Sequence, residues 1–193
     1  IIKQMRLNNQ EIIELLGDKY DKFNRVSFIE SDPISVPHLF VKKEDIEIAG
    51  FLAATIAWGQ RVTIIKNANK LVQLMDLAPY DFVMNHTAKD LKRFDLFKHR
   101  TFNAIDVAFF ITSLKNIYTT KGGLEQVFAN HSTDMQKSIH HFRAMFFEIE
   151  HPERTKKHVS DPYNNSAAKR INMFLRWMVR NDNRGVDFGL WKS

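Results

Sequence analysis

The segment from Ser166 to Arg180 constrains the fold most, because it predicts an uninterrupted amphipathic helix. Ser166 is a suitable N-cap, and apolar residues recur after it at three- and four-residue steps. They form one stripe that must face a core: Ala167, Ile171, Phe174, Leu175 and Met178. A second row at the same steps is polar and carries Lys169, Asn172, Arg176 and Arg180. Such a row is either an ordinary solvated face or a surface that meets an anion.

Similar periodicity along the rest of the chain predicts an all-α fold. Asn8 and Glu11 form a capping-box pattern that starts an N-terminal helix. The low content of helix breakers, 7 Gly and 5 Pro in 193 residues, agrees with long helices. Further helices are expected at about 44–57, 63–75, 103–118, 124–128 and 135–147, with short ones after Pro79 and Thr87. The prolines within residues 24 to 43 predict an extended linker between two parts of the fold.

Composition narrows the class of protein. The chain has no cysteine, which excludes disulfides, thiolate zinc sites and iron–sulfur clusters within these residues. His140 and His141 are adjacent and lack ligand spacing, so we expect no metal site and no cofactor. No stretch has the roughly 18 apolar residues of a membrane span, and no signal peptide is recognisable, so a cytoplasmic location is expected. A net charge of +6 favours a polyanionic partner.

Two corners of the predicted fold carry polar residues suited to binding. Gln60 and Arg61 follow Gly59 between two predicted helices, where they would be exposed. Residues 98–101, with the sequence KHRT, lead into the helix that begins near Asn103. A basic segment at a helix N-terminus suits a phosphate, although it can also be a solvated corner.

These corners carry a family resemblance. The stretch from Ile46 to Leu74, with its corner WGQR, resembles the first helix pair of the helix-hairpin-helix DNA glycosylase superfamily, endonuclease III type. Gln60 matches the glutamine that enters the duplex in that family. The segment that begins at Ser166 and carries Lys169 looks like the second hairpin helix with its lysine near the start. The segments HRTFN, KRINMFLRWMVR and DFGLW also resemble an uncharacterised bacterial family known only as a domain of unknown function.

The resemblance implies a two-lobed, helical glycosylase-like fold with an incomplete second lobe. Residues 1–43 would be an N-terminal helix and linker belonging to the second lobe. Residues 44–181 would form a helical barrel domain that ends in the Lys169 helix. Residues 182–193 would begin a C-terminal segment.

It also implies base excision on damaged, double-stranded DNA. Lys169 would attack the sugar C1′ of a flipped-out nucleotide and form a Schiff base, and an aspartate further along the chain would assist. Burial of Lys169 among arginines would favour its neutral amine. The residues expected to contact DNA are Gln60, Arg61, Arg100, Arg170, Arg176 and Arg180.

Two features depart from the family pattern. The glycine-rich turn before the lysine is replaced by residues 161–166, where asparagine can supply positive φ. The family aspartate is followed by Thr or Val and then His, whereas Asp187 is followed by Phe and Gly, so we expect that aspartate beyond Ser193.

Three functions therefore remain open from the sequence. The first is a DNA glycosylase and lyase that uses Lys169. The second is a nucleic-acid-binding module of the same fold that does not cut a glycosidic bond. The third is a helical protein-interaction domain whose basic face docks an acidic partner.

Overall fold

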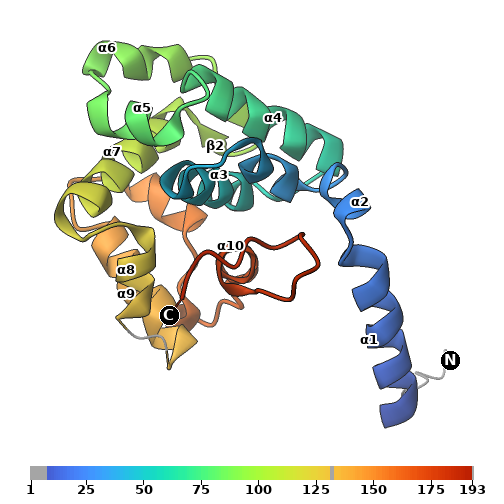
Figure 1. Cartoon of the computed structure of the whole chain (residues 1–193). Coiled ribbons are helices and arrows are strands. Elements are labelled where there is room, and N and C mark those ends of the chain that lie inside the picture. Colours follow the sequence, from blue (N-terminus) through green and yellow to red (C-terminus); the bar gives the residue numbers. More distant parts are fainter. Residues whose placement is uncertain (1–7, 131–132, 193) are drawn as a thin grey trace, which may run out of the picture.

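The computed structural model describes residues 8–130 and 133–192, and this part of the chain is predominantly helical, as the sequence predicts (Figure 1). The α-helices are α1 (Asn9–Phe23), α2 (Val26–Ile29), α3 (Lys43–Thr55), α4 (Arg61–Leu74), α5 (Pro79–Asn85), α6 (Ala88–Leu91), α7 (Ala104–Thr120), α8 (Leu124–Ala129), α9 (Met135–Phe146) and α10 (Lys169–Val179). Short 3-10 turns are η1 (Pro33–Ser35), η2 (Pro37–Leu39), η3 (Lys92–Phe94), η4 (Glu153–His158) and η5 (Pro162–Asn164). A two-residue antiparallel hairpin, β1 (Lys98–His99) with β2 (Phe102–Asn103), was not predicted.

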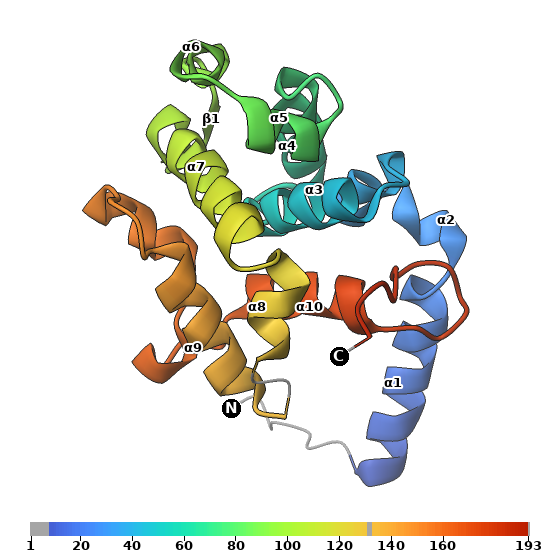
Figure 2. The ribbon, with the colours of Figure 1, turned by 60° about the vertical axis from the view of Figure 1, so that its left-hand side comes forward.

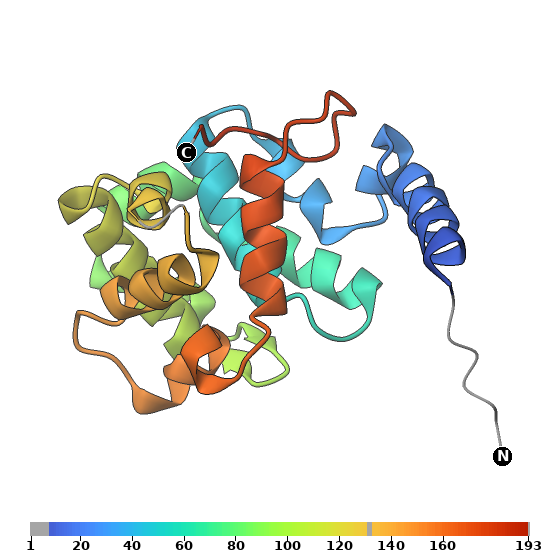
Figure 3. The same ribbon diagram turned by 90° about the horizontal axis from the view of Figure 1, so that it is seen from below.

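Helix α3 is the centre of the fold. Every residue from Ile46 to Thr55 is buried, because α4, α5, α10, η1 and η2 all pack against this helix. Figure 3 shows α10 lying alongside α3. Phe51 of α3 sits within an aromatic cluster, with ring centroids 5.5–5.7 Å from those of Phe110, Phe142, Phe146 and Phe174. Edge-to-face ring contacts at such distances add to the apolar area that the core removes from water.

Glycine at position 50 lets α3 and α10 approach each other. A Cβ added to Gly50 would lie 3.3 Å from Met178 Cε and 3.5 Å from the Phe174 ring. Both partners are core residues of α10 with no exposed surface. A larger side chain at this position would therefore have to push the two helices apart.

Helix α1 begins at the predicted capping box, in which Asn8 and Glu11 exchange hydrogen bonds. None of its residues is buried, and it projects from the helical body in two views (Figures 1 and 2). Its C-terminal end is attached to the loop after α10. There Asp182 accepts hydrogen bonds from Asn24 Nδ2 at 2.7 Å and from the Tyr20 hydroxyl at 3.3 Å.

The expected extended linker at residues 24–43 is wrong. This segment contains α2, η1 and η2, and its Ile34 and Val36 belong to the buried core. Proline stands at the first position of both 3-10 turns, where its missing N–H and fixed φ are compatible with a turn. Asp32 caps η1 by accepting the Ile34 N–H at 3.1 Å. The prolines therefore start compact turns against α3.

The segment after α10 turns back over that helix. Phe188 N–H donates to Trp177 O at 2.8 Å, and Trp191 N–H donates to Met178 O at 3.0 Å. The Trp191 indole then donates to Glu47 Oε1 at 2.6 Å, which ties the segment to α3. The part of the chain that the structure describes has no helix long and apolar enough to cross a membrane.

Replacing Gly50 by Val tests the close contact between α3 and α10. We expect a loss of roughly 1–3 kcal/mol in the free energy of unfolding, because the added methyl groups overpack a filled site. Urea denaturation measures the change. Gly17→Val is the matched control, since nothing lies within 4 Å of a Cβ added to Gly17. The control should change the free energy by at most about 0.5 kcal/mol, and equal losses in both variants would contradict the packing argument.

Candidate functional site

The N-cap of helix α10 lies two residues after the predicted N-cap, Ser166. Its N-cap is Ala168, at φ +44°, and no side chain caps the helix. Ser166 Oγ instead accepts the Ala168 N–H at 3.2 Å. Asn165 has φ +56°, which is the positive φ that the sequence allows for asparagine in this turn. The first turn of α10 therefore presents backbone N–H groups without a side-chain partner.

Lys169 is the first residue of α10 and is exposed. Its ammonium group has no hydrogen-bond or ion-pair partner within residues 8–130 and 133–192. The burial expected from the sequence is therefore wrong for the free protein. An exposed lysine beside an uncapped helix start is accessible to an anionic ligand.

Two of the predicted binding residues meet at the corner between α3 and α4. Gln60 is the N-cap of α4, is exposed, and makes no capping bond with its side chain. Arg100 stands at φ +54° in the turn of the β1–β2 hairpin. Its side chain crosses to the corner, where Arg100 Nε lies 3.2 Å from the place of a Cβ on Gly59. We call the two exposed cations Arg100 and Lys169 the exposed basic set.

Arg170 has a structural position rather than a free one. Its guanidinium donates to the carbonyl of Thr55 at the end of α3 and lies 4.6 Å from the centre of the Trp58 ring. Burial lowers the pKa of Arg170 below its ordinary value. Arg170 thus joins the start of α10 to the end of α3.

The other three predicted arginines are paired with carboxylates. Arg61 Nε lies 4.0 Å from Asp32, and Arg176 Nε lies 3.1 Å from Asp187. Arg180 Nε lies 2.8 Å from the same Asp187 oxygen. Of the two carboxylates, Asp187 is the more deeply buried, with a side chain that is only 1% exposed. The last two cations of the polar row on α10 therefore already pair with a buried carboxylate of the same chain.

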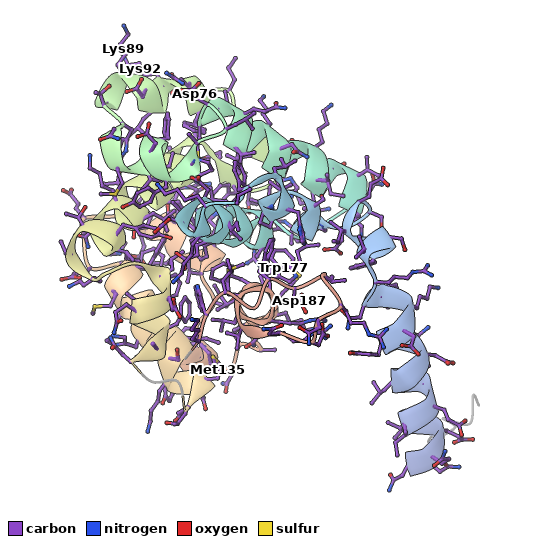
Figure 4. The ribbon with its side chains drawn as sticks, in the orientation of Figure 1. Asp76, Lys89, Lys92, Met135, Trp177 and Asp187 are labelled. Atoms are coloured by element: carbon purple, nitrogen blue, oxygen red, sulfur yellow. The ribbon has the colours of Figure 1, made fainter. Side chains whose placement is uncertain are left out.

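Asp32 and Asp187 face one cavity of about 270 Å³. Its walls are aromatic, aliphatic and charged, and consist of Phe23, Phe28, Asp32, Ile34, Arg61, Met173, Arg176, Trp177, Val186 and Asp187. In Figure 4, Trp177 and Asp187 lie close together beside the loop that follows α10. We call this space the carboxylate cavity. Ring walls and a few charged groups can hold a small planar, polar ligand.

Burial raises the pKa of Asp32 above its ordinary value. The Ile34 N–H and the charges of Arg61 and Arg176 oppose this shift, while Asp187 adds to it. A carboxyl that takes up a proton more readily than usual, beside a second carboxylate, is a candidate proton donor or acceptor.

The first turn of α10 is connected to this cavity along one face of the helix. Lys169, Met173 and Arg176 follow at steps of four and three residues, so they share that face. Met173 and Arg176 line the cavity. Lys169 precedes Arg176 by about 10 Å along the helix axis. The exposed lysine therefore heads the row that leads into the carboxylate cavity.

Sequence reasoning missed Asp32 and named Asp187 only as a departure from the family pattern. Asp32 stands before Pro33, which indicates a turn cap but gives no sign of burial. The family aspartate was expected beyond Ser193, whereas Asp187 is the buried carboxylate that α10 reaches within this chain. Across the described ranges, no group of three or more His, Cys, Asp or Glu is placed to hold a metal ion.

Comparison with known proteins identifies a family. Residues 32–193 match the model of a family described as "Protein of unknown function (DUF2400)". No curated protein and no solved structure matches the chain.

Asp32→Asn tests the effect of burial on this carboxyl. Because the folded pKa is raised, the native state favours the protonated form, and this contribution is lost as the pH rises through the folded value. The wild type should therefore lose stability relative to the variant as the pH rises from below 3.8, the ordinary pKa of an aspartate, to neutral pH. Urea unfolding at both pH values measures the difference. A constant difference would contradict the assigned cause.

Asp187→Asn is the contrasting variant in the same cavity. It removes the charge that pairs with Arg176 and Arg180, so that Arg176 loses its carboxylate partner and Arg180 keeps only Asp182, at 2.8 Å. We expect it to destabilise the protein by about 1–3 kcal/mol at neutral pH. A gain in stability would show that these ion pairs do not hold the loop to α10.

Proposed function

The chain belongs to this family of proteins of unknown function, and we propose that it binds nucleic acid and acts on an unstacked nucleotide by base excision. Arg100 would contact the phosphate backbone. The carboxylate cavity would receive the base, and Lys169 would serve as the nucleophile. One observation carries the proposal: the helix face headed by Lys169 leads to a cavity walled by rings and two carboxylates.

The chemistry of the cavity supports this assignment. An extruded base has a flat apolar surface and polar edges, and the cavity offers Trp177, Phe28 and charged groups from three segments. Asp32, whose pKa is raised by burial, can give a proton to the departing base. Arg61 and Arg176 supply positive charge at the same wall.

Lys169 can complete the reaction when its amine is neutral. The amine nitrogen bonds to C1′, the bond between C1′ and the base breaks, and the base leaves with that electron pair and a proton. Opening of the sugar ring and loss of the amine proton then give a Schiff base. Lys169 is exposed in the free protein, so its amine is accessible to a bound nucleotide.

A second candidate function is nucleic-acid binding without chemistry. It is favoured by the exposure of Lys169 and by the absence of any partner for its ammonium group across the described residues. The same contacts would then serve only to hold the backbone. The two functions differ in whether a covalent adduct forms.

Borohydride trapping distinguishes these functions. Duplexes that carry an abasic site or an oxidised purine are mixed with the protein and reduced, and the adduct is resolved by denaturing electrophoresis. The wild type should form an adduct, because reduction fixes the Schiff base, and Lys169→Ala should lose it. Lys66→Ala, which removes an exposed lysine of α4, should leave it unchanged. Binding without an adduct would favour the second candidate.

The salt dependence of binding tests which cations contact phosphate. Each lost phosphate contact should reduce the slope of log K against log salt by about one. We expect this reduction for Arg100→Ala, because its side chain is exposed and has no carboxylate partner in residues 8–130 and 133–192. Under the second candidate function, in which Lys169 holds the backbone, Lys169→Ala should show the same reduction. Fluorescence anisotropy with a labelled duplex over a salt series measures the slope.

Arg176→Ala and Arg180→Ala are the matched controls on the same helix. Both side chains are paired with Asp187, so their loss should lower stability but leave the salt slope nearly unchanged. The choice of Arg100 from the exposed basic set as the phosphate contact fails if these two variants change the slope more than Arg100→Ala does.

A further inference from the structure

A second pocket opens beside Trp58, and the proposed base-excision chemistry does not use it. Its volume is about 360 Å³. Four segments that are far apart in the sequence form its walls: the corner after α3, the β1–β2 turn, η4 and the first turn of α10. Its lining residues are Trp58, Thr101, Lys157, His158 and Arg170.

Two cations of this pocket have no carboxylate partner within the described ranges. Lys157 is exposed and makes no ion pair there. Arg170 contacts only the Thr55 carbonyl and the Trp58 ring. Asp106 lies 3.4 Å from His158, but its charge is neutralised by Arg154 at 2.6 Å. The pocket therefore carries two positive charges that no protein anion balances.

Asp106 is occupied by its own hydrogen bonds. Its oxygens accept the Arg154 guanidinium, the Thr155 hydroxyl at 2.8 Å and the Asn103 N–H at 3.0 Å. These contacts anchor η4 to the start of α7. The Asp106 carboxylate thus stabilises the wall of the pocket, and it does not balance the positive charges of Lys157 and Arg170.

His158 brings an unpartnered polar group to the wall. Its side chain is 2% exposed, and its buried Nε2 has no hydrogen-bond partner. Burial lowers the pKa of His158 to about 4; Asp106 opposes the shift, and the charges of Lys157, Arg170 and Arg154 reinforce it. The ring is therefore neutral at physiological pH. The Nε2 atom lies toward Asp106, so His158 is a buried part of the wall that can report on the charges around it.

We propose that this pocket binds a dianionic phosphate monoester. Two unpaired cations match the roughly two negative charges of such a group, whereas an internal phosphodiester carries one. The Thr101 residue, which also lines the pocket, supplies a further hydroxyl donor. The source of the monoester is the terminal phosphate of a nucleic-acid strand crossing the Gln60 corner; this part rests on the proposed function.

The first experiment tests the pocket without nucleic acid. Inorganic phosphate is titrated at constant ionic strength, at a pH high enough for its dianion to predominate, while the ring signals of His158 are followed by NMR. A saturable shift is expected in the wild type, weakened about tenfold in Lys157→Ala. Lys156→Ala is the matched control, because that neighbouring lysine is paired with Glu153 at 2.7 Å. The proposed phosphate site is overturned if the wild type shows no saturable shift, or if phosphate binding weakens equally in both variants.

The second experiment tests the source of the phosphate. Nicked duplexes that differ only in carrying a 5′-phosphate, a 3′-phosphate or hydroxyl ends are compared by their dissociation constants. The wild type should bind one phosphorylated nick about tenfold more tightly than the hydroxyl form. Lys157→Ala should remove this preference and Lys156→Ala should keep it.

The two experiments separate this inference from the proposed function. A phosphate response of His158 without any duplex binding would refute the nucleic-acid function and leave a site for a small phosphate monoester. Duplex binding that is indifferent to end phosphorylation would overturn the assigned source. Loss of the response in the first experiment would overturn the pocket even if borohydride trapping succeeds.

Discussion

The close contact between α3 and α10 is the constraint on which the other features depend. Gly50 leaves room for Met178 and Phe174, and Arg170 joins the start of α10 to the last carbonyls of α3. At the opposite end, Glu47 of α3 accepts the Trp191 indole N–H. The two helices are thus fixed at both ends. Because Lys169 heads one face of α10 and Asp187 is held by another turn of that helix, their relative position follows from this packing.

The distribution of charge explains why only some cations are available to a ligand. Burying a carboxylate without a partner is costly, so each deeply buried acid is supplied with donors. Asp187 pairs with Arg176 and Arg180, and Asp106 pairs with Arg154, so the charges of these cations are already balanced within the protein. The basic residues counted in the net charge of +6 are therefore not all available to bind an anionic ligand. The cations that remain without a carboxylate partner within residues 8–130 and 133–192 include Arg100, Lys157 and Lys169.

Helix positions followed from the sequence because apolar spacing and capping chemistry are local. The capping boxes at Asn8 and Thr87 begin helices as predicted. The prediction for residues 24–43 was wrong because the two prolines were taken to favour an extended chain. In the structure both prolines begin 3-10 turns that pack against α3. At the site, Gln60 and Lys169 were placed correctly at helix starts. The pairing of Arg176 and Arg180 with Asp187 could not be predicted, because the loop direction after α10 depends on tertiary hydrogen bonds.

The environment of Trp58 decides where a base could stack. One face of its ring is covered by the Arg170 guanidinium, and His158 is stacked against it at 6.0 Å between ring centroids. His99 meets the same ring edge-on at 5.1 Å. Trp58 thus has a structural role, because its ring is packed against these three side chains. From the sequence alone, its position near Gln60 had made it a candidate for stacking with a base. A base that left its duplex at this corner could not stack on Trp58 and would instead contact the rings of the carboxylate cavity. The role of Trp58 would be to line the pocket proposed for the phosphate.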